Sequence, residues 1–391
     1  MTPARTYPSR RDGVRLLIVD PAAGAIAESV ITALPTLLQP GDLLVVNDAA
    51  TLPASLRGHD DQGRAVELRL LSAIEAAPGA AREAMTARAT LEGSGVAPAA
   101  PQFWAALMGA GDWQQRTEDR PPPPALGPGD RVRVGGLTAW IVARSPLSSR
   151  LVSIHFEAPG QDALWAALYQ EGRPVQYAHL AHELPLWAVQ TVYAARPWAF
   201  EMPSAGRPLS WEILLSLRRR GVRIASLTHA AGLSATGDAA VDAALPLPER
   251  YDIPAATVNA IARTRARRGQ VIAVGTTVVR ALEGAAAASG HLVPGEGTTD
   301  LRIDGHFRPR VVDGIVSGLH AAGESHFELL SAFVRGAPEL LRRGVERAET
   351  AGCRSHELGD AMLISSGSTS GAAGRTGARD DTARANRARG A

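Results

Sequence analysis

The sequence QVIAVGTTVVRALEGAAAA, residues 270–288, decides the fold because it joins a short apolar run to an Ala-rich segment through one tight turn. The run QVIAV ends at Gly275, and the segment that carries Arg280 and Glu283 follows at once. A short apolar run bounded by glycine is typical of a buried strand, and the Ala-rich segment is long enough to be a helix. Strand, turn and helix in this order predict a mostly parallel sheet whose faces are covered by helices.

The same pattern occurs on both sides of this stretch. The segment LSWEILLSLRRRG reads as a helix that stops at Gly221, and the strand-like run VRIASLT follows it. The segment PAATVNAIARTRARRG is a second helix, which stops at Gly269 immediately before QVIAV. Nearer the start of the chain, LLVVN at residues 43–47 is a short buried strand. These units predict an α/β domain.

The pattern changes between residues 57 and 157, where short β-type runs follow one another without helices. They are AVELRLL, FWAALMG, RVRVGG, LTAWIVAR and RLVSIHF. Several short strands at close spacing predict a small β-barrel inserted into the α/β domain. The expected domains are therefore a discontinuous α/β domain, residues 1–56 and 158–364, an inserted β-barrel, residues 57–157, and a C-terminal tail, residues 365–391.

Charge and composition limit the partners. The 391 residues are 45% hydrophobic, enough for substantial cores, and the formal net charge is +2. The tail holds five arginines and two aspartates but almost no large apolar groups, so it is expected to be disordered, and the rest of the chain has a charge of about −1. Any RNA contact must therefore come from a local arginine patch or from the tail.

Other absences in the sequence narrow the class of protein. Cys353 is the only cysteine, so no intrachain disulfide and no Cys-based zinc site is expected. No apolar stretch reaches the ~18 residues of a membrane span, and no signal-peptide core is recognisable, so a cytoplasmic location is expected.

The turn after QVIAV has two interpretations. Gly275 permits a close approach of the backbone, and Thr276 or Thr277 could cap the helix that follows. The turn has neither a lysine nor Gly-x-Gly-x-x-Gly spacing, which excludes the phosphate-binding P-loop and the dinucleotide fingerprint. The segment is either a capped helix start or a site for a carboxylate or another anion at a helix N-terminus.

Histidines give weaker signals. The segment HLAHE, residues 179–183, matches neither form of the His-Glu-x-x-His zinc pattern, and no metal is expected there. His320, Glu324 and His326 lie in a short segment before a helix, where they are either acid/base groups or solvated loop residues. No Gly-x-Ser-x-Gly turn follows a strand, which disfavours a Ser-His-Asp hydrolase.

Six blocks of sequence occur together in one order. They are LQPGDLLVVNDAATLPASLRG, VQTVYAARP, PSAGRPLSWEILLSLRRRGVRIASLTH, VIAVGTTVVRALEGAA, VVDGIVSGLHAAGESHFELLSAF and GDAMLI. In this order and spacing the chain resembles the S-adenosylmethionine:tRNA ribosyltransferase-isomerase family of queuosine biosynthesis, over residues 15–364.

The resemblance implies an enzyme, both transferase and isomerase, with an α/β domain and an inserted barrel. The implied reaction moves the ribosyl part of S-adenosylmethionine to a 7-aminomethyl-7-deazaguanine base in tRNA and forms epoxyqueuosine, with loss of adenine and methionine. S-adenosylmethionine is then a co-substrate and tRNA a partner, and no separate cofactor and no metal is expected.

The resemblance also implies site residues. The expected catalytic residues are His229, His320 and Asp313. The expected substrate-binding residues are Gly275, Thr276, Thr277, Arg280, Asn47, Arg57, Ser204, Gly206 and Arg207.

Several polar positions depart from the family pattern. Where the family has Asn-Thr-Arg, this chain keeps Asn47 but continues with Asp-Ala-Ala. The segment that contains Arg207 lacks the family's histidine. Of the family's His-Ser-Glu segment, only the glutamate remains, as Glu249. Two alternatives therefore stay open. One is a divergent S-adenosylmethionine- or nucleoside-directed transferase on a small molecule, and the other is a binding protein without catalysis.

Overall fold

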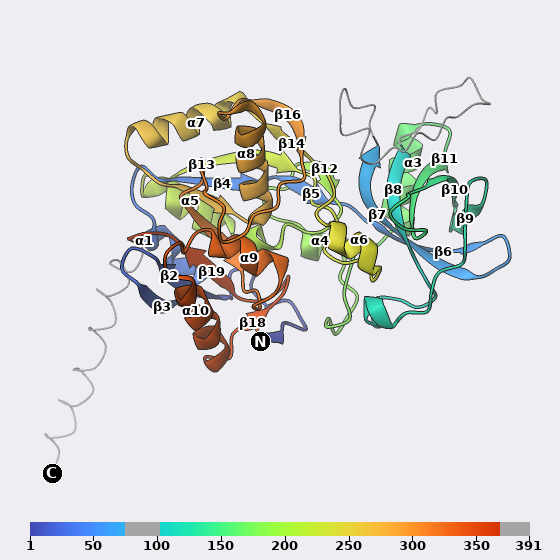
Figure 1. The fold of residues 1–391 in the computed structure, drawn as a ribbon, viewed down its shortest axis with the longest axis horizontal. Coiled ribbons are helices and arrows are strands. Elements are labelled where there is room, and N and C mark those ends of the chain that lie inside the picture. The colour runs from blue at the N-terminus through green and yellow to red at the C-terminus, as the bar shows by residue number, and fades with distance from the viewer. Residues whose placement is uncertain (75–101, 368–391) are drawn as a thin grey trace, which may run out of the picture.

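The computed structural model describes residues 1–74 and 102–367, which form a large sheet with helices on both faces and a closed barrel beside it (Figure 1). This confirms the predicted fold class, an α/β domain with an inserted β-barrel. The prediction of a disordered tail concerns residues that, from 368 onward, lie outside the described part of the chain.

The large sheet has nine strands, and its centre is parallel. In spatial order the strands are β16 (Gly295–Thr299), β14 (Glu249–Ile253), β13 (Arg223–His229), β4 (Leu43–Asn47), β15 (Val271–Val274), β17 (Gly314–Gly318), β19 (Ala361–Ile364), β2 (Arg15–Asp20) and β3 (Ala25–Val30). Strands β13, β4, β15 and β17 run parallel, whereas β14 and β19 pair with this group antiparallel. The carboxyl ends of the four parallel strands therefore meet at one edge.

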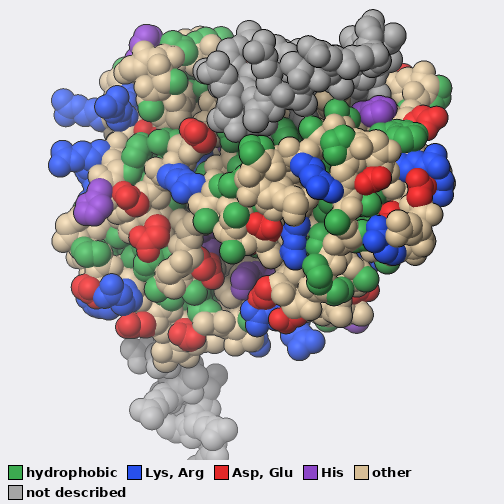
Figure 2. All heavy atoms as spheres, turned by 45° about the vertical axis from the view of Figure 1, so that its right-hand side comes forward, with side chains coloured by type: hydrophobic (Ala, Val, Ile, Leu, Met, Phe, Trp, Pro, Cys, Tyr) green, Lys and Arg blue, Asp and Glu red, His purple; other side chains and the backbone are tan. Residues whose placement is uncertain are grey.

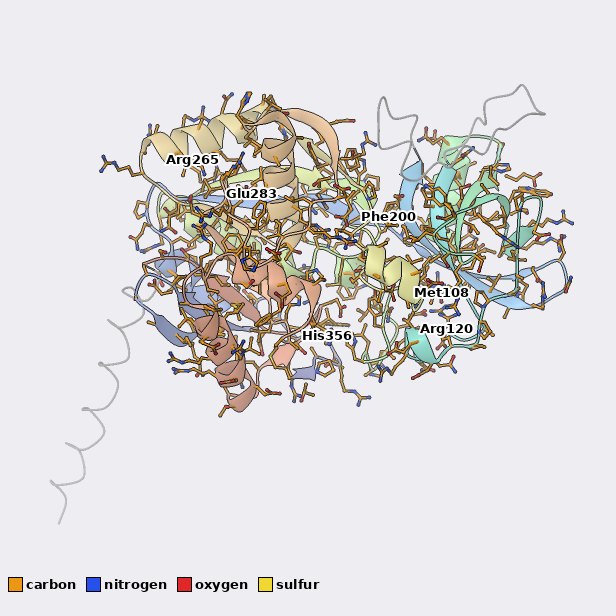
Figure 3. The ribbon with its side chains drawn as sticks, viewed as in Figure 1. Met108, Arg120, Phe200, Arg265, Glu283 and His356 are labelled. Carbon is orange, nitrogen blue, oxygen red and sulfur yellow. The ribbon has the colours of Figure 1, made fainter. Side chains whose placement is uncertain are left out.

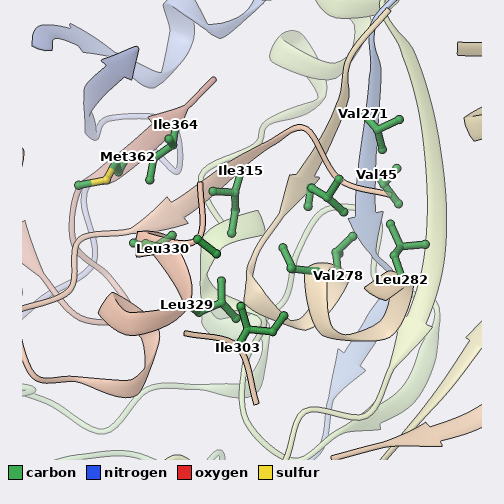
Figure 4. Close-up of a cluster of buried hydrophobic side chains, with 14 of the residues drawn as sticks. Val45, Val271, Val278, Leu282, Ile303, Ile315, Leu329, Leu330, Met362 and Ile364 are labelled. Atoms are coloured by element: carbon green, nitrogen blue, oxygen red, sulfur yellow. The ribbon is translucent and has the colours of Figure 1, made fainter. Parts of the chain in front are cut away.

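Helices cover both faces of this sheet. One face carries α7 (Ala255–Ala266), α8 (Thr276–Ser289), α9 (Ser325–Ser331) and α10 (Pro338–Thr350). Their apolar side chains pack on the strands, as Val278, Leu282 and Leu329 do in Figure 4. The other face carries α1 (Leu34–Leu37) and α5 (Trp211–Arg219). The predicted helix stops before Gly221 and Gly269 are confirmed.

The barrel is closed by six antiparallel strands. They are β6 (Ser55–Asp60), β7 (Ala65–Ile74), β8 (Gln102–Met108), β9 (Arg131–Val134), β10 (Leu137–Arg144) and β11 (Leu151–Glu157). The five β-type runs quoted above supply β7 to β11, which confirms them as strands. Because the chain enters the barrel soon after β4 ends, the barrel lies on the carboxyl side of the sheet (Figure 1).

Other elements belong neither to the nine-stranded sheet nor to the barrel strands. They are β1 (Thr2–Pro3), β5 (Ala49–Thr51), α3 (Gln161–Glu171), α4 (Leu186–Val189), β12 (Arg196–Ala199), the 3₁₀ helix η3 (Ser204–Gly206), α6 (Ala239–Ala244) and β18 (Arg354–Ser355). Within the described ranges, no helix has both the length and the apolar character needed to cross a membrane.

Candidate active site at the carboxyl edge of the sheet

Gly275 forms the turn between β15 and α8. Its φ of 90° lies in a region that favours glycine, and its N–H donates to the carbonyl of Val316 at 2.8 Å. The expectation that Thr276 or Thr277 caps the helix is wrong, because no side chain caps the N-terminus of α8. Thr276 is buried, and the Thr277 hydroxyl lies 3.4 Å from Nδ2 of Asn47 instead. The positive end of this helix is therefore available to an anion.

The substitution Gly275→Ala tests this turn. There is space for the added Cβ, whose nearest neighbours lie at 3.5 Å, so the expected cost of about 1–3 kcal/mol comes from the backbone conformation. We expect a lower melting temperature together with a lower turnover, because relaxation of the turn displaces the first N–H groups of α8.

Gly290→Ala is the matched control for this turn. Gly290 has a φ of 75° at the other end of the same helix, with nothing within 4 Å of an added Cβ. This variant should lose stability and keep its turnover. Equal turnover in the two variants would contradict a role for the Gly275 turn in binding.

Asn47 ends β4 and joins it to β13. Its Nδ2 donates to the carbonyl of His229 at 3.0 Å, and its Oδ1 accepts from the N–H of His229 at 2.9 Å. The side chain is only 2% exposed. Asn47 was predicted to bind substrate. In the structure its side chain holds the backbone of His229 in place.

His229, Glu249 and Arg280 form a buried group at the same edge. His229 is completely buried, and its Nε2 lies 3.3 Å from Oε2 of Glu249. The same carboxylate oxygen accepts from the guanidinium of Arg280, and Oε1 accepts from the N–H of Gly232 at 2.8 Å. Glu249 was absent from the predicted site, although the sequence kept it while its neighbours in the family segment changed. One histidine, from β13, and one arginine, from α8, are thus organised around a single carboxylate on β14.

Several polar atoms of this group lack partners. Within the described ranges, the two ring nitrogens of His229 and Nε of Arg280 are buried without a well-aligned hydrogen bond. Buried polar groups are nearly always paired, and the exceptions tend to serve a function. Three buried polar atoms without such a bond, from His229 and Arg280, thus lie near the uncapped start of α8.

Burial changes the protonation of these groups. Burial and then the nearby charge of Arg280 lower the pKa of His229 well below its ordinary value, so its imidazole is neutral at pH 7. Burial raises the pKa of Glu249, and the charge of Arg280 opposes this rise. The site therefore holds a neutral imidazole that can accept a proton.

A second group lies at the end of β17 and the start of α9. Nδ1 of His320 is 3.3 Å from Oε2 of Glu324, and the rings of His320 and His326 stack at 4.7 Å. Burial, followed by the charges of His320 and Arg280, lowers the pKa of His326 to about 3. Because Arg280 lowers the pKa of both His229 and His326, it lies close to each of them. The two groups form one site around Arg280.

The lowered histidine pKa values predict loss of stability in acid. The unfolded chain binds protons below about pH 6.5, whereas His229 stays neutral in the fold, and so does His326 down to about pH 3. Stability is therefore complete above pH 6.5 and falls as the pH falls toward the folded pKa values. Each histidine accounts for at most about 2 kcal/mol at pH 5.

Urea unfolding at pH 7 and pH 5 measures this loss. His326→Gln should show a smaller loss between the two pH values than the parent protein. The exposed His291→Gln is the control and should behave like the parent. An identical loss in His326→Gln and in the parent would contradict a neutral, buried His326.

A third group lies beside the second. Nε2 of His179 is 2.9 Å from Oε2 of Glu357, and the ring of His356 stacks on that of His179 at 4.7 Å. The charge of Glu357 acts on the pKa of His326, and that of His356 on the pKa of Glu324, so the groups are neighbours. Figure 3 shows His356 on the side of the α/β domain toward the barrel.

This third group has the composition of a metal site. In the sequence, the residues near His179 that could bind a metal are those of HLAHE. The fold instead brings His179 to His356 and Glu357, and the possible ligand atoms of these three residues lie within 4.8 Å of one another. Two of these atoms already pair as histidine and carboxylate. These two atoms are within ion-pair distance but are buried without a well-aligned hydrogen bond, and the absence of a metal stays a prediction.

The structure does not bring three of the predicted residues to this edge. Asp313 accepts from the N–H of Val271 at 2.8 Å, so it lies at the amino end of β15, the opposite edge, and its catalytic role stays a prediction that this position does not support. Arg57 is exposed on β6 of the barrel and pairs with Glu183 at 3.0 Å. These residues lie in or next to the blocks of sequence that resemble the family, but their position in the sequence does not determine which edge of the sheet they reach.

Arg207 is also committed elsewhere. It is 4% exposed, its Nε donates to the carbonyl of Ala188 at 2.8 Å, and its guanidinium lies over the ring of Tyr7. Burial and then the charge of Arg11 lower its pKa to about 10. In the structure Arg207 packs against these neighbours, and its contact with substrate stays a prediction.

The segment before Arg207 does approach the site. Ser204 and Gly206 belong to η3, and an added Cβ at position 275 would touch Ala205 of this element at 3.5 Å. An added Cβ at Gly206 would collide with the Tyr193 hydroxyl, so this position requires glycine. The turn of η3 thus packs directly against the turn at Gly275.

The sequence is similar to known proteins over most of its length. A family model described as "Queuosine biosynthesis protein" matches residues 2–364. The S-adenosylmethionine:tRNA ribosyltransferase-isomerase of Trichlorobacter lovleyi is 31% identical, over 92% of this chain and 95% of that protein. The protein of the same name from Thiobacillus denitrificans is 35% identical, over 92% of this chain and 93% of that protein.

A solved structure is similar as well. It is the crystal structure of S-adenosylmethionine tRNA ribosyltransferase from Thermotoga maritima, with 21% identity, coverage of 93% of this chain and 96% of that chain, and a TM-score of 0.46. The family model spans almost all of the described chain, and the relatives named above exceed 30% identity over nine-tenths of it. The chain therefore belongs to the queuosine biosynthesis protein family, a family of enzymes whose relatives named here are S-adenosylmethionine:tRNA ribosyltransferase-isomerases.

Proposed function

We propose that the protein transfers the ribosyl part of S-adenosylmethionine to a 7-aminomethyl-7-deazaguanine base in tRNA, with epoxyqueuosine as the product. The reaction removes a proton from the ribosyl carbon next to the sulfonium, expels adenine and joins the ribosyl part to the amine of the base. A ribosyl oxygen closes the epoxide as the carbon–sulfur bond breaks and methionine leaves. The observation that carries the proposal is the set of buried, unpartnered polar atoms of His229 and Arg280 beside the uncapped start of α8.

Each demand of the reaction has a group at this edge. The uncapped N–H groups of α8 and the positive charge of Arg280 suit the methionine carboxylate. A neutral imidazole, of His229 or His326, can accept the proton next to the sulfonium. His320, held by Glu324, can supply a proton to the departing adenine. These roles are part of the proposal.

The experiment that tests the function is adenine release. The protein is incubated with S-adenosylmethionine alone, with unmodified tRNA, and with tRNA that carries the aminomethyl base, and adenine is measured by chromatography. Release only with the modified tRNA supports the proposal. Release with a free 7-aminomethyl-7-deazaguanine compound but not with tRNA would favour a small-molecule transferase. Binding of S-adenosylmethionine without release under any condition would favour a binding protein.

A further inference from the structure

The amino-terminal edge of the parallel sheet brings two helix ends together. Helix α5 lies on one face and α7 on the other, and each ends just before a glycine that leads into β13 or β15. The N–H of Gly41, which precedes β4, donates to the carbonyl of Gly221 at 2.9 Å. Gly269 packs against the carbonyl of Gly41 so closely that a Cβ would collide with it. The ends of α5 and α7 therefore flank the same short turn.

These helix ends carry a dense group of arginines. The basic edge consists of Arg218, Arg219 and Arg220 at the end of α5 and Arg263, Arg265, Arg267 and Arg268 at the end of α7, all of them exposed. In the described part of the chain, none of them forms an ion pair with a carboxylate. Residues 255–269 contain no acidic residue. Figure 3 shows Arg265 on the side of the domain away from the barrel.

Stabilisation of the helix ends explains only part of the positive charge of the basic edge. Cations near a helix C-terminus offset the negative end of the helix dipole, which is equivalent to roughly half an elementary charge. Three and four arginines at the two ends exceed that need. Elsewhere on the surface arginines pair with acids, as Arg342 does with Glu339 and Arg347 with Glu28.

The carboxylates nearest in sequence do not neutralise the basic edge. Asp42 is buried and accepts from the N–H groups of Gln39 and Gln270, both at 2.8 Å. Asp313 accepts from the N–H of Val271. Over most of the face shown in Figure 2, by contrast, cationic and anionic side chains are intermixed. The basic edge is a local excess of positive charge in a fold whose total charge is near zero.

The C-terminus of the described chain lies at the same edge. The hydroxyl of Ser365 donates to Oε1 of Gln270 at 2.6 Å, and Nε2 of Gln270 donates to the carbonyl of Ser366 at 2.9 Å. Gln270 lies four residues beyond the end of α7. The sequence that follows residue 367 contains five arginines and two aspartates.

We propose that the basic edge binds the phosphate backbone of the acceptor tRNA, at the opposite end of the sheet from the candidate site. The identity of the RNA rests on the proposed function. The five residues of β4 separate the two edges by about 17 Å, so a folded RNA with one base in the site has other phosphates within reach of the basic edge. Exposed guanidinium groups bind phosphates in pairs of hydrogen bonds and release counterions from the RNA.

Removing the arginines of α7 tests the surface. The test variant is R263Q/R265Q/R267Q/R268Q, and the matched control is R335Q/R342Q/R343Q/R347Q, which removes four exposed arginines on or next to α10. Fluorescence anisotropy measures binding of unmodified tRNA at several salt concentrations. In the test variant we expect the Kd to rise by about 10-fold or more and the slope of log K against log salt to fall by roughly 2 to 3. The control should keep the parent values. An equal loss in both variants, or no loss in the test variant, would overturn the proposal.

Two further measurements separate this surface from the reaction. Adenine release with a short RNA hairpin that carries the aminomethyl base, but cannot reach the basic edge, should be the same in the test variant and the parent. With whole tRNA the KM of the test variant should rise. If no RNA supports adenine release, the proposed function fails, and the anisotropy result still decides whether the basic edge binds tRNA. Duplex DNA that binds as tightly as tRNA would overturn the assignment to RNA.

Discussion

Arg280→Ala is expected to lower adenine release by a factor of about 100 or more. Arg280 pairs with Glu249 and lowers the pKa of both His229 and His326. Without it, only the hydrogen bond from the N–H of Gly232 opposes the effect of burial on Glu249, so the pKa of this carboxyl rises further. The positive charge proposed to hold the methionine carboxylate is lost as well. Initial rates under saturating tRNA measure the effect.

Loss of folding must be separated from loss of catalysis in this variant. Removing one partner of a buried ion pair costs about 3–5 kcal/mol, because the other charge stays buried without compensation. The double variant Arg280→Met with Glu249→Gln leaves no buried charge, so it should fold and still be inactive. Arg342→Ala, on the exposed surface of α10, should keep the parent rate. A parent-like rate in the double variant would remove Arg280 from the mechanism.

The second large effect is expected in the barrel, where Glu67→Ala should destabilise the protein by about 3–5 kcal/mol. Glu67 is buried between Nε of Arg69, at 2.8 Å, and the guanidinium of Arg120, and it accepts from the hydroxyl of Ser55 at 2.7 Å. Both arginines are themselves buried, so the substitution leaves two positive charges without their partner. Thermal and urea unfolding measure the loss.

The pH dependence distinguishes this network from the histidines. Burial raises the pKa of Glu67, but Arg69 and Arg120 outweigh burial and hold it at about 2. The stability from this group is therefore present above about pH 4.5 and is lost as the pH falls through 2. The histidine effect begins at higher pH, below about 6.5. Glu118→Ala removes an exposed carboxylate and should cost less than about 1 kcal/mol. A cost this small for Glu67→Ala would contradict the buried network.

Much of the fold could be predicted because local sequence patterns agree with it. The apolar run before Gly275 and the Ala-rich segment after it have different lengths and compositions, and each takes the structure that its pattern favours. The barrel strands are likewise recognisable from short β-type runs without helices between them. Helix α10 and the antiparallel pairing of β19 were not predicted, since pairing partners depend on contacts between distant segments.

The site was harder to predict because it depends on side-chain direction and distant contacts. Asp313 belongs to the same block as His320, yet β17 begins at Gly314 and carries the two residues to opposite edges. Arg207 was expected to bind substrate, but its guanidinium is buried against the Ala188 carbonyl. His179 meets Glu357 only because the fold closes over a long stretch of chain. Sequence alone gave no sign of this pairing.

The most direct test of the central claim is mass analysis of the tRNA nucleosides after reaction with S-adenosylmethionine that is isotopically labelled in its ribose. The account predicts that the label appears in the substituent of the 7-deazaguanine base, in amounts equal to the adenine released, and that Arg280→Ala abolishes both. Label that stays in S-adenosylmethionine, or that leaves it without entering the tRNA base, would contradict the proposed function.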